Sequence, residues 1–460
     1  DFIARDSETL KPCFSTARTT PPPRSIPIGK YSLPVSRGKV EMLRQGPTLW
    51  KLLQDAGIQS TAFRSPVDFP PTATGGRTLS GLTTPDIHGS YGIFSLYSES
   101  PDRAAGSVSG GVIDRVAVDD GVARCVLRGP RNTFRRDASA DVPFVVEVDR
   151  RRRLARVRIQ SSTLLLQQGE WSDWVRVSFR MLPVVAATSG ICRFYLKQVD
   201  PYLELYVSPV NIDPLDPAMP VSAPDDYARA LAEDVGPFYT QGMPEDTAAL
   251  SAGVFDDDEF REQSTFVIEE RMRFFEYELN RFRDGFLFFY FSSLDLNSHA
   301  FWRCIDRKHP LYSAELEQRH GEFLPSLYAR VDDAVGRAMA EIGNDGLLFV
   351  VSDHGFVPFR RQFNLNSWLL DHGYARVRDR LERGRSVYFG NTDWTRTSAY
   401  GLGINSLYLN LRGREPDGIV APGSDADRLR AELIERLTAE RDPETGDQII
   451  RSVYRPEDIY

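Results

Sequence analysis

Two uninterrupted apolar runs, at residues 286–291 and 347–351, restrict the fold of this chain most strongly. Each run follows a long segment in which apolar residues recur at helical spacing, and the only polar group in either run is the hydroxyl of Tyr290. Runs of this length without polar alternation are typical of strands buried on both faces of a sheet. Because helix and strand alternate along the chain, we predict an α/β fold.

The helical and strand patterns define the expected α/β core. The first 36 residues are rich in Pro and Ser, which favours an extended covering segment rather than a helix or a strand ladder. We predict helices at residues 44–56, 257–282 and 315–342, and strands at residues 60–64, 286–291 and 347–351.

The pattern changes in the middle of the chain, where short β-rich runs alternate with Gly, Asp and Arg turns. Such spacing without intervening helices predicts an antiparallel β-rich insertion in the α/β fold. We therefore expect three parts, with residues 1–100 and 216–460 forming the core and residues 101–215 forming the insertion. Its predicted strands are residues 112–118, 144–148, 154–159, 175–179 and 194–199.

Composition argues against several classes of protein. With 56 Lys and Arg against 64 Asp and Glu, the formal net charge is −8, so no overall basic field indicates nucleic acid or an anionic membrane. The four cysteines are widely spaced without a CxxC pair, which indicates neither a disulfide framework nor a thiolate zinc site. Both apolar runs are far shorter than the roughly 20 residues of a membrane helix, so we expect a soluble domain. Four arginines at 150–153 lie between two predicted strands, and we interpret them as a solvated hairpin turn.

Each apolar run leads into one aspartate and one histidine. Asp295 and His299 follow the first run four residues apart, so one helical turn would bring both side chains to the same side. Asp353 and His354 follow the second run, where Gly355 relaxes the backbone. Because ligands of open α/β sheets bind beyond the carboxyl ends of the strands, both pairs should reach the same edge.

Two carboxylates and two imidazoles form a ligand set that suits Zn²⁺, and also Mn²⁺ or other first-row metals. Either pair alone has an ordinary explanation, as a turn cap or as part of a solvated helix face. Both pairs at the ends of apolar strands favour a metal site. We therefore predict Asp295, His299, Asp353 and His354 as metal ligands, with room for two ions of the kind that stabilise phosphoryl displacement.

These motifs resemble two metal motifs of the alkaline phosphatase superfamily, in particular its type I phosphodiesterase/nucleotide pyrophosphatase branch. The resemblance implies a doubly wound, mostly parallel α/β core that binds two divalent metal ions, usually zinc. Asp295 and His299 would lie on one metal, and Asp353 and His354 would hold or share the other. The motifs are residues 293–302 and 350–356, with supporting likeness at 63–71, 169–174, 366–374, 394–400 and 413–420.

The family pattern contains three further residues: an Asp ending the first strand, a Ser or Thr nucleophile opening the next helix, and a late His. The resemblance would place the first two before Asp1 and the last beyond Tyr460. None of the remaining histidines matches the late position. We therefore expect an internal fragment that lacks its catalytic nucleophile, binds metal weakly and does not turn over substrate alone. The unmatched histidines are His88, His309, His320 and His372.

The function that we expect is metal-dependent hydrolysis of small phosphate esters, with phosphodiesters or nucleotide-like molecules as substrates. Phosphomonoester, sulfate or phosphonate hydrolysis and phosphomutase activity on the same fold stay open, as does a non-catalytic relative that binds a ligand or partner through the β insertion. In the sequence upstream of Asp1, a Ser or Thr at a helix start with an Asp before it would favour the enzyme, and their absence would favour the non-catalytic relative.

Overall fold

The structure is a computed structural model that describes residues 4–5, 12–13, 16–20, 22–29, 31–36, 38–135, 138–182, 186–344, 346–384, 389–403 and 405–459. The chain divides into two compact units, one of residues 16–358 and one of residues 1–15 with 359–460. All four predicted metal ligands belong to the first unit, so the site is described within that unit alone.

The strand that precedes Asp295 and His299, β24, belongs to a four-stranded sheet in the order β23-β8-β7-β24. β7 (Ser60–Ser65) pairs in parallel with both β8 (Arg77–Ser80) and β24 (Phe286–Phe289), while β23 (Ser222–Ala223) is antiparallel at the far edge. β7 is buried along its whole length, and the strands predicted at 60–64 and 286–291 are confirmed, the second over four residues. Since the two ladders at β7 are parallel, the carboxyl ends of β7 and β24 meet at one edge.

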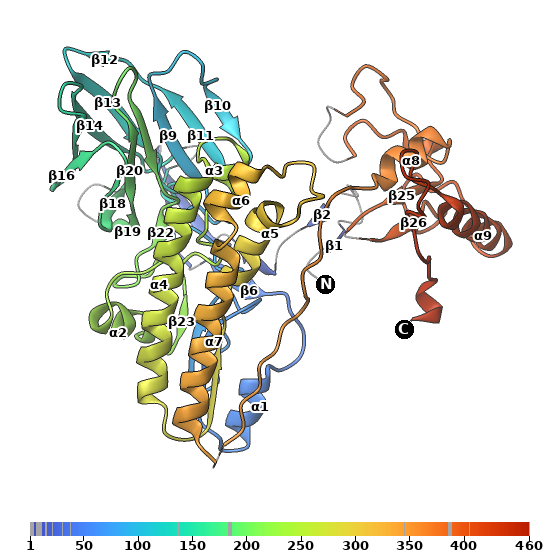
Figure 1. The fold of residues 1–460 in the computed structure, drawn as a ribbon, viewed down its shortest axis with the longest axis horizontal. Helices are drawn as coiled ribbons and strands as arrows, with labels where there is room; N and C mark the ends of the chain where they lie inside the picture. Colours follow the sequence, from blue (N-terminus) through green and yellow to red (C-terminus); the bar gives the residue numbers. More distant parts are fainter. Residues whose placement is uncertain are drawn as a thin grey trace. The chain divides into compact units, whose positions relative to one another are not determined.

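Long helices pack beside this sheet. α4 (Asp257–Arg281) begins with a capping box in which the Asp256 carboxylate accepts from the Glu259 N–H and the Glu259 side chain accepts from the Asp256 N–H. α4 and α7 (Phe323–Ile342) lie side by side (Figure 1). The helix predicted at 315–342 is two helices, α6 (Ala314–His320) and α7, because Gly321, a poor helix former, lies at the break. The other helices of this unit are α1 (Leu49–Asp55), α2 (Tyr227–Asp234), α3 (Thr247–Ser251) and α5 (Ser293–Ile305).

The β-rich runs predicted between residues 101 and 215 form strands. Alternate side chains of β14 and β18 are buried, as a half-buried antiparallel strand requires. The arginines at 150–153 form the turn between β14 and β15, where Arg150 donates to the Val199 and Pro201 carbonyls and pairs with Glu99. The strands in this range are β10 (Gly106–Val108), β11 (Gly111–Arg115), β12 (Val118–Asp119), β13 (Val122–Leu127), β14 (Val142–Asp149), β15 (Leu154–Ile159), β16 (Ser162–Gln167), β17 (Glu170–Trp171), β18 (Val175–Leu182), β19 (Ala186–Cys192), β20 (Phe194–Gln198), β21 (Glu204–Val207) and β22 (Asn211–Ile212). β9 (Phe94–Ser98) precedes the range and pairs with β11 and β21.

These strands form three sheets. Five consecutive strands, β12 to β16, make an antiparallel meander, and β18, β19 and β22 make a smaller antiparallel sheet. The third sheet, in the order β10-β11-β9-β21-β20-β17, is mixed, because β11 runs parallel to β9. The β-rich strands and the α/β sheet share one compact unit, so the division into core and insertion stays a prediction.

The N-terminal segment differs from the prediction of an extended segment without a ladder. β3 (Ala17–Thr20) pairs antiparallel with β6 (Lys39–Met42), and β4 (Ser25–Ile28) pairs antiparallel with β5 (Tyr31–Pro34). The prediction is wrong because both strands of a two-stranded ladder are edges, where a proline without an N–H is tolerated.

The prediction of a strand at residues 347–351 is also wrong. The segment lies outside every strand, and its apolar side chains are exposed, Leu347 by 83%, Phe349 by 75% and Val351 by 77%. Among the residues that the structure describes, none from 346 to 358 makes a backbone–backbone hydrogen bond. A strand needs a neighbour for its N–H and C=O groups, and an apolar sequence pattern does not report whether that neighbour is present.

The second unit has its own core. α8 (Leu365–Asp371) and α9 (Ser424–Ala439) pack with a two-stranded antiparallel sheet of β25 (Ala399–Gly401) and β26 (Leu407–Leu409). Trp368 contributes to this core, and its indole N–H donates to Glu440 over 2.9 Å. The remaining elements are β1 (Ala4–Arg5), β2 (Pro12–Cys13), η1 (Trp394–Arg396) and η2 (Pro456–Asp458).

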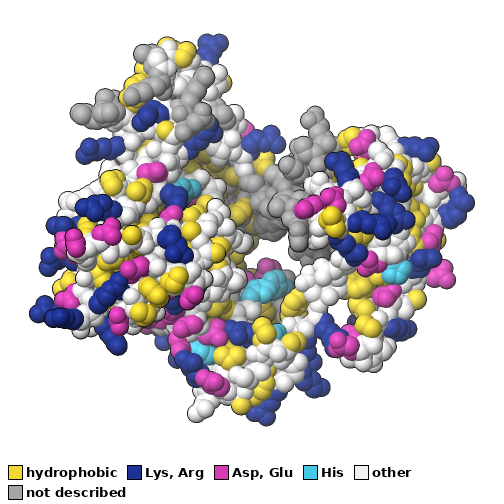
Figure 2. All heavy atoms as spheres, turned by 90° about the horizontal axis from the view of Figure 1, so that it is seen from above, with side chains coloured by type: hydrophobic (Ala, Val, Ile, Leu, Met, Phe, Trp, Pro, Cys, Tyr) yellow, Lys and Arg dark blue, Asp and Glu magenta, His cyan; other side chains and the backbone are white. Residues whose placement is uncertain are grey.

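The molecular surface carries charges of both signs. Acidic and basic side chains are interspersed on the face shown in Figure 2. Within the described part of the chain, no helix is both long enough and apolar enough to cross a membrane.

One buried carboxyl group gives the fold a pH dependence that can be measured. Asp246 caps α3 by accepting from the Ala249 N–H over 2.8 Å, and it accepts from the Tyr206 hydroxyl over 2.5 Å. Burial raises the pKa of Asp246 to about 6, above the ordinary value of about 4. The folded protein therefore retains this proton between about pH 4 and pH 6, whereas the unfolded chain releases it. The contribution of this carboxyl group to the free energy of unfolding is therefore fully present below about pH 4 and is lost as the pH rises through about 6.

We expect the stability advantage of the native protein over Asp246→Asn to shrink by up to about 3 kcal/mol between pH 4 and pH 7, at about 1.4 kcal/mol per pKa unit. Urea unfolding of both proteins across this range measures the difference. A difference that is constant with pH would contradict the assignment.

Candidate metal centre

α5 positions the first Asp/His pair directly after β24. Asp295 lies in the first turn of α5 and His299 lies one turn later, as the sequence predicts. The His299 Nε2 atom is 3.5 Å from Asp295 Oδ1, and the two side chains are 65% and 35% exposed. The opposite side of α5 is fixed by buried residues that include Phe301 and Cys304, so the pair projects from an anchored helix.

The second pair approaches the same carboxylate from the extended segment after residue 346. His354 Nε2 is 3.5 Å from Asp295 Oδ1 and 3.8 Å from Asp353 Oδ2. The Phe356 ring contacts the imidazoles of both His299 and His354, with ring centroids 5.0 and 5.5 Å apart. The structure therefore brings both predicted pairs together, although the segment that carries the second pair is not a strand.

The spacing of these donor atoms fits a metal ion. Bonds of roughly 2.0–2.1 Å to tetrahedral zinc separate neighbouring ligand atoms by roughly 3.3–3.4 Å, close to the 3.5 Å from Asp295 Oδ1 to each imidazole. Asp295 Oδ1 is also buried without a hydrogen-bond partner. In the described ranges, however, no group of three or more His, Cys, Asp or Glu side chains is placed so that it could hold a metal ion. The residues thus fit a metal by donor type and pairwise spacing, and the Asp353 side chain is 81% exposed.

Sequence reasoning missed two titratable groups beside these ligands. Burial, followed by the charges of Asp295, Asp353 and Glu245, raises the pKa of Tyr290 to about 12. Tyr290 is therefore a neutral hydroxyl at neutral pH and can donate a hydrogen bond at this edge. Its one signal in the sequence is that it is the only polar residue of its apolar run. Glu245 is fully buried, and nothing in the sequence marks it.

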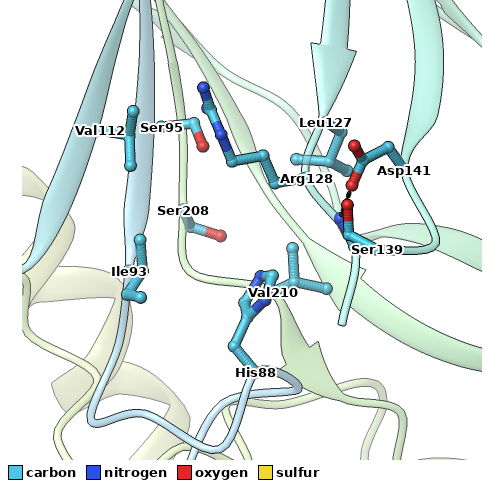
Figure 3. Close-up of a pocket in the computed structure, with 11 residues that line it drawn as sticks. His88, Ile93, Ser95, Val112, Leu127, Arg128, Ser139, Asp141, Ser208 and Val210 are labelled. Carbon is cyan, nitrogen blue, oxygen red and sulfur yellow. Dashed lines mark hydrogen bonds between the residues drawn. The ribbon is translucent and has the colours of Figure 1, made fainter. Parts of the chain in front are cut away.

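A separate cavity of about 230 Å³ lies in the β-rich region (Figure 3). His88, Arg128 and Asp141 line it, together with serines and apolar side chains, and none of the four predicted ligands does. Both terminal nitrogens of Arg128 already pair with Asp114. Because its strongest charge is neutralised in this way, we do not assign the reaction to this cavity.

The protein thus has a mixed α/β fold in which two Asp/His pairs lie together after β24, a strand that pairs in parallel with β7. This chain belongs to the type I phosphodiesterase/nucleotide pyrophosphatase family, whose sequence model matches residues 211–460, more than half of the chain. All four predicted ligands fall inside the matched range. Comparison with curated proteins and with solved structures gives no match. Family membership indicates a hydrolase of the phosphodiesterase/pyrophosphatase type, and the family is generally metal-dependent.

Proposed function

We propose that this protein is a metal-dependent phosphodiesterase or nucleotide pyrophosphatase with an alkaline phosphatase-like, doubly wound core. Asp295, His299, Asp353 and His354 would hold two divalent ions, with zinc favoured by the mixed oxygen and nitrogen donors. The observation that carries the proposal is the approach of both imidazoles to within 3.5 Å of Asp295 Oδ1, a buried oxygen without a hydrogen-bond partner. Family membership supports the reaction class.

The chain's own residues would prepare the site in three ways. Anchoring of α5 orients Asp295 and His299, Phe356 limits the rotation of both imidazoles, and the Tyr290 hydroxyl supplies a neutral donor. Bound divalent ions would stabilise the negative charge that develops on the transferred phosphoryl group and its leaving oxygen.

We also propose that the Ser or Thr nucleophile comes from sequence outside residues 1–460. The serines next to the ligands are poorly suited to attack a substrate that arrives from solvent. Ser293 and Ser298 are fully buried, and the Ser352 hydroxyl donates to the His354 carbonyl over 2.6 Å. A nucleophile supplied from elsewhere would be consistent with these three described serines, each of which is either buried or hydrogen-bonded to the backbone.

Hydrolysis of bis(p-nitrophenyl) phosphate tests both proposals. We expect the protein extended by its flanking sequence to hydrolyse the diester with Zn²⁺ or Mn²⁺ and to lose activity on chelation, while residues 1–460 alone do not turn over. Robust metal-dependent hydrolysis by residues 1–460 would contradict the location of the nucleophile. Metal binding without hydrolysis of the diester, p-nitrophenyl phosphate or p-nitrophenyl sulfate by the longer protein would identify a non-catalytic relative.

A further inference from the structure

The segment of residues 346–358, which carries the second Asp/His pair, is held in place without a strand ladder. All of its residues are described, and Phe356 alone among them is not exposed. Its hydrogen bonds run within the segment: the Ser352 hydroxyl donates to the His354 carbonyl over 2.6 Å, and His354 Nδ1 lies 3.1 Å from the Gly355 carbonyl oxygen. The position of the pair therefore depends on side-chain contacts with other elements.

Phe356 makes such contacts with two rings of α5. Its ring centroid lies 5.0 Å from that of His299 and 5.9 Å from that of Trp302, on which it stacks with an angle of 24° between the planes. His299 and Trp302 are three residues apart, so they share one side of the helix. The same phenyl ring lies 5.5 Å from the imidazole of His354 in its own segment. Phe356 thus connects the segment to the helix that carries the first pair.

Trp302 connects this aromatic contact to the hydrophobic core. Its half-buried indole packs against a core cluster that includes Phe301 and Phe323. The next residue, Arg303, pairs with Asp257 at the start of α4, which fixes α5 further. Phe356 therefore rests on a ring that belongs to a fixed helix.

We propose that Phe356, stacked on Trp302, is the positioning residue that holds the second Asp/His pair beside Asp295. Without this contact, the backbone freedom of the segment would reduce the fraction of molecules in which the pair reaches Asp295, and the apparent metal affinity of the pair would fall in proportion. Asp295 and His299 share α5, so an ion bound there does not depend on Phe356. The effect on metal binding rests on the proposed function, whereas the effect on the segment does not.

The test substitutes Trp302→Leu, which removes the ring beneath Phe356 and leaves the segment itself unchanged. In metal-free protein of residues 1–460, we expect the backbone ¹⁵N order parameters at residues 353–357 to fall from about 0.85 to below about 0.6, the values of rigid and flexible backbone. Phe356→Leu should have the same effect. Phe356→Tyr keeps the ring and should retain native values, since a hydroxyl on a half-buried ring can reach solvent. If the indole only packed against the core, its loss would lower stability without changing these order parameters.

Titration with Zn²⁺ alone measures the consequence for the metal centre. In Phe356→Leu and Trp302→Leu, the affinity for one of two zinc ions should fall about tenfold, as is typical when residues behind metal ligands are lost. The affinity for the other ion should change less than twofold, because its ligands share α5. Phe356→Tyr should bind both ions as the native protein does.

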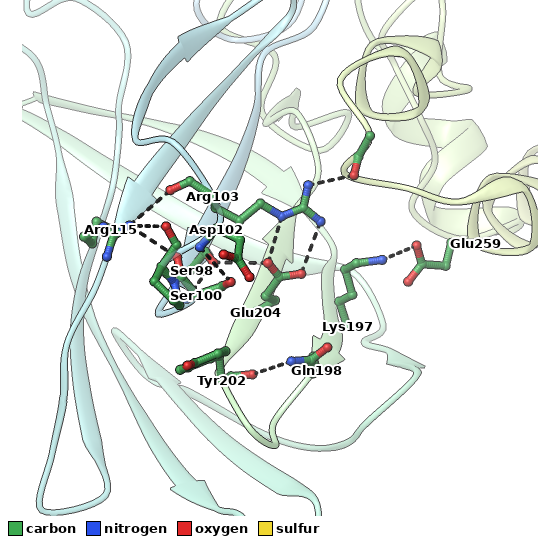
Figure 4. A network of polar contacts seen from close by, with 12 residues as sticks. Ser98, Ser100, Asp102, Arg103, Arg115, Lys197, Gln198, Tyr202, Glu204 and Glu259 are labelled. Carbon is green, nitrogen blue, oxygen red and sulfur yellow. Dashed lines mark hydrogen bonds and ion pairs between the residues drawn. The ribbon is translucent and has the colours of Figure 1, made fainter.

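Trp171→Leu is the matched control. Like Trp302, Trp171 is half-buried, packs against the same core cluster and stacks on an aromatic ring, that of Tyr195, with centroids 4.8 Å apart. It lies in the β-rich region, next to β20, whose Lys197 pairs with Glu259 of α4 (Figure 4). This variant should leave the order parameters of the segment and both zinc affinities unchanged.

Native order parameters at residues 353–357 in a folded Trp302→Leu protein would overturn the inference, whether or not zinc binds. Values below about 0.6 in the unmodified protein would also overturn it. Absence of zinc binding by the unmodified protein would contradict the proposed function, while the order parameters would still decide the role of Phe356. If Trp302→Leu does not fold, Phe356→Leu changes a residue outside the buried core. A flexible segment in that variant would support the inference, and a rigid one would overturn it.

Discussion

Replacing Asp295 with alanine is expected to lower phosphodiester hydrolysis by about a thousandfold in the protein that includes the flanking sequence. Metal ions contribute several kcal/mol of charge stabilisation to such reactions, and each 1.4 kcal/mol is a factor of ten. Asp295 has the largest expected effect of the four ligands because its Oδ1 atom lies 3.5 Å from both imidazoles. Measurement of kcat/KM together with zinc content tests the prediction.

Asp332→Ala is the matched control, since Asp332 is an exposed carboxylate on α7. We expect that variant to keep both its activity and its zinc. An Asp295→Ala protein that retained more than a tenth of the native kcat/KM with full zinc content would contradict the assignment of this carboxylate.

Replacing Phe63 with alanine is expected to lower the free energy of unfolding by about 3–5 kcal/mol, the usual cost of removing a buried aromatic ring. Phe63 is fully buried in β7, and its ring centroid lies 4.6 Å from that of Phe289 and 5.3 Å from that of Phe274. The same substitution at Phe349 should cost less than about 0.5 kcal/mol, because that side chain is 75% exposed.

Urea unfolding measures the free energy of unfolding of both alanine variants. Because each variant loses the same phenyl ring, the two values compare a position in a buried strand with one in the exposed apolar segment. A cost at Phe349 as large as that at Phe63 would show that residues 347–351 are buried in solution. The strand predicted from the sequence would then be correct, and the exposed placement of this segment would be wrong.

Local patterns in the sequence were sufficient for elements whose interactions are themselves local. The helix predicted at 257–282 and the one-turn spacing of Asp295 and His299 depend on residues three or four apart, and both are present. Burial of β7 follows from the helices and strands around it, but its place directly after a helix that stops at Gly57 still predicted a strand. The prediction from the apolar run at 347–351 failed, because strand formation also depends on a neighbour that no local pattern reports.

The candidate site was predictable only in part for the same reason. The sequence predicted that both Asp/His pairs would reach one edge, and their role as metal ligands stays a prediction. It did not predict the position of the second pair against Asp295 and Phe356, which is a tertiary contact. Four buried charged side chains escaped notice altogether, those of Arg64, Glu245, Glu270 and Arg271. Arg64 lies within a motif that supports the likeness to the family. It joins the other three only when β7, α4 and the loop before α3 pack together.

The most direct test of the central claim is anomalous diffraction at the zinc absorption edge from crystals of residues 1–460 grown or soaked with zinc. The account predicts a zinc peak within bonding distance of Asp295 Oδ1 and the Nε2 atoms of His299 or His354. The absence of a peak at these atoms, in crystals that bind zinc elsewhere on the protein, would contradict it.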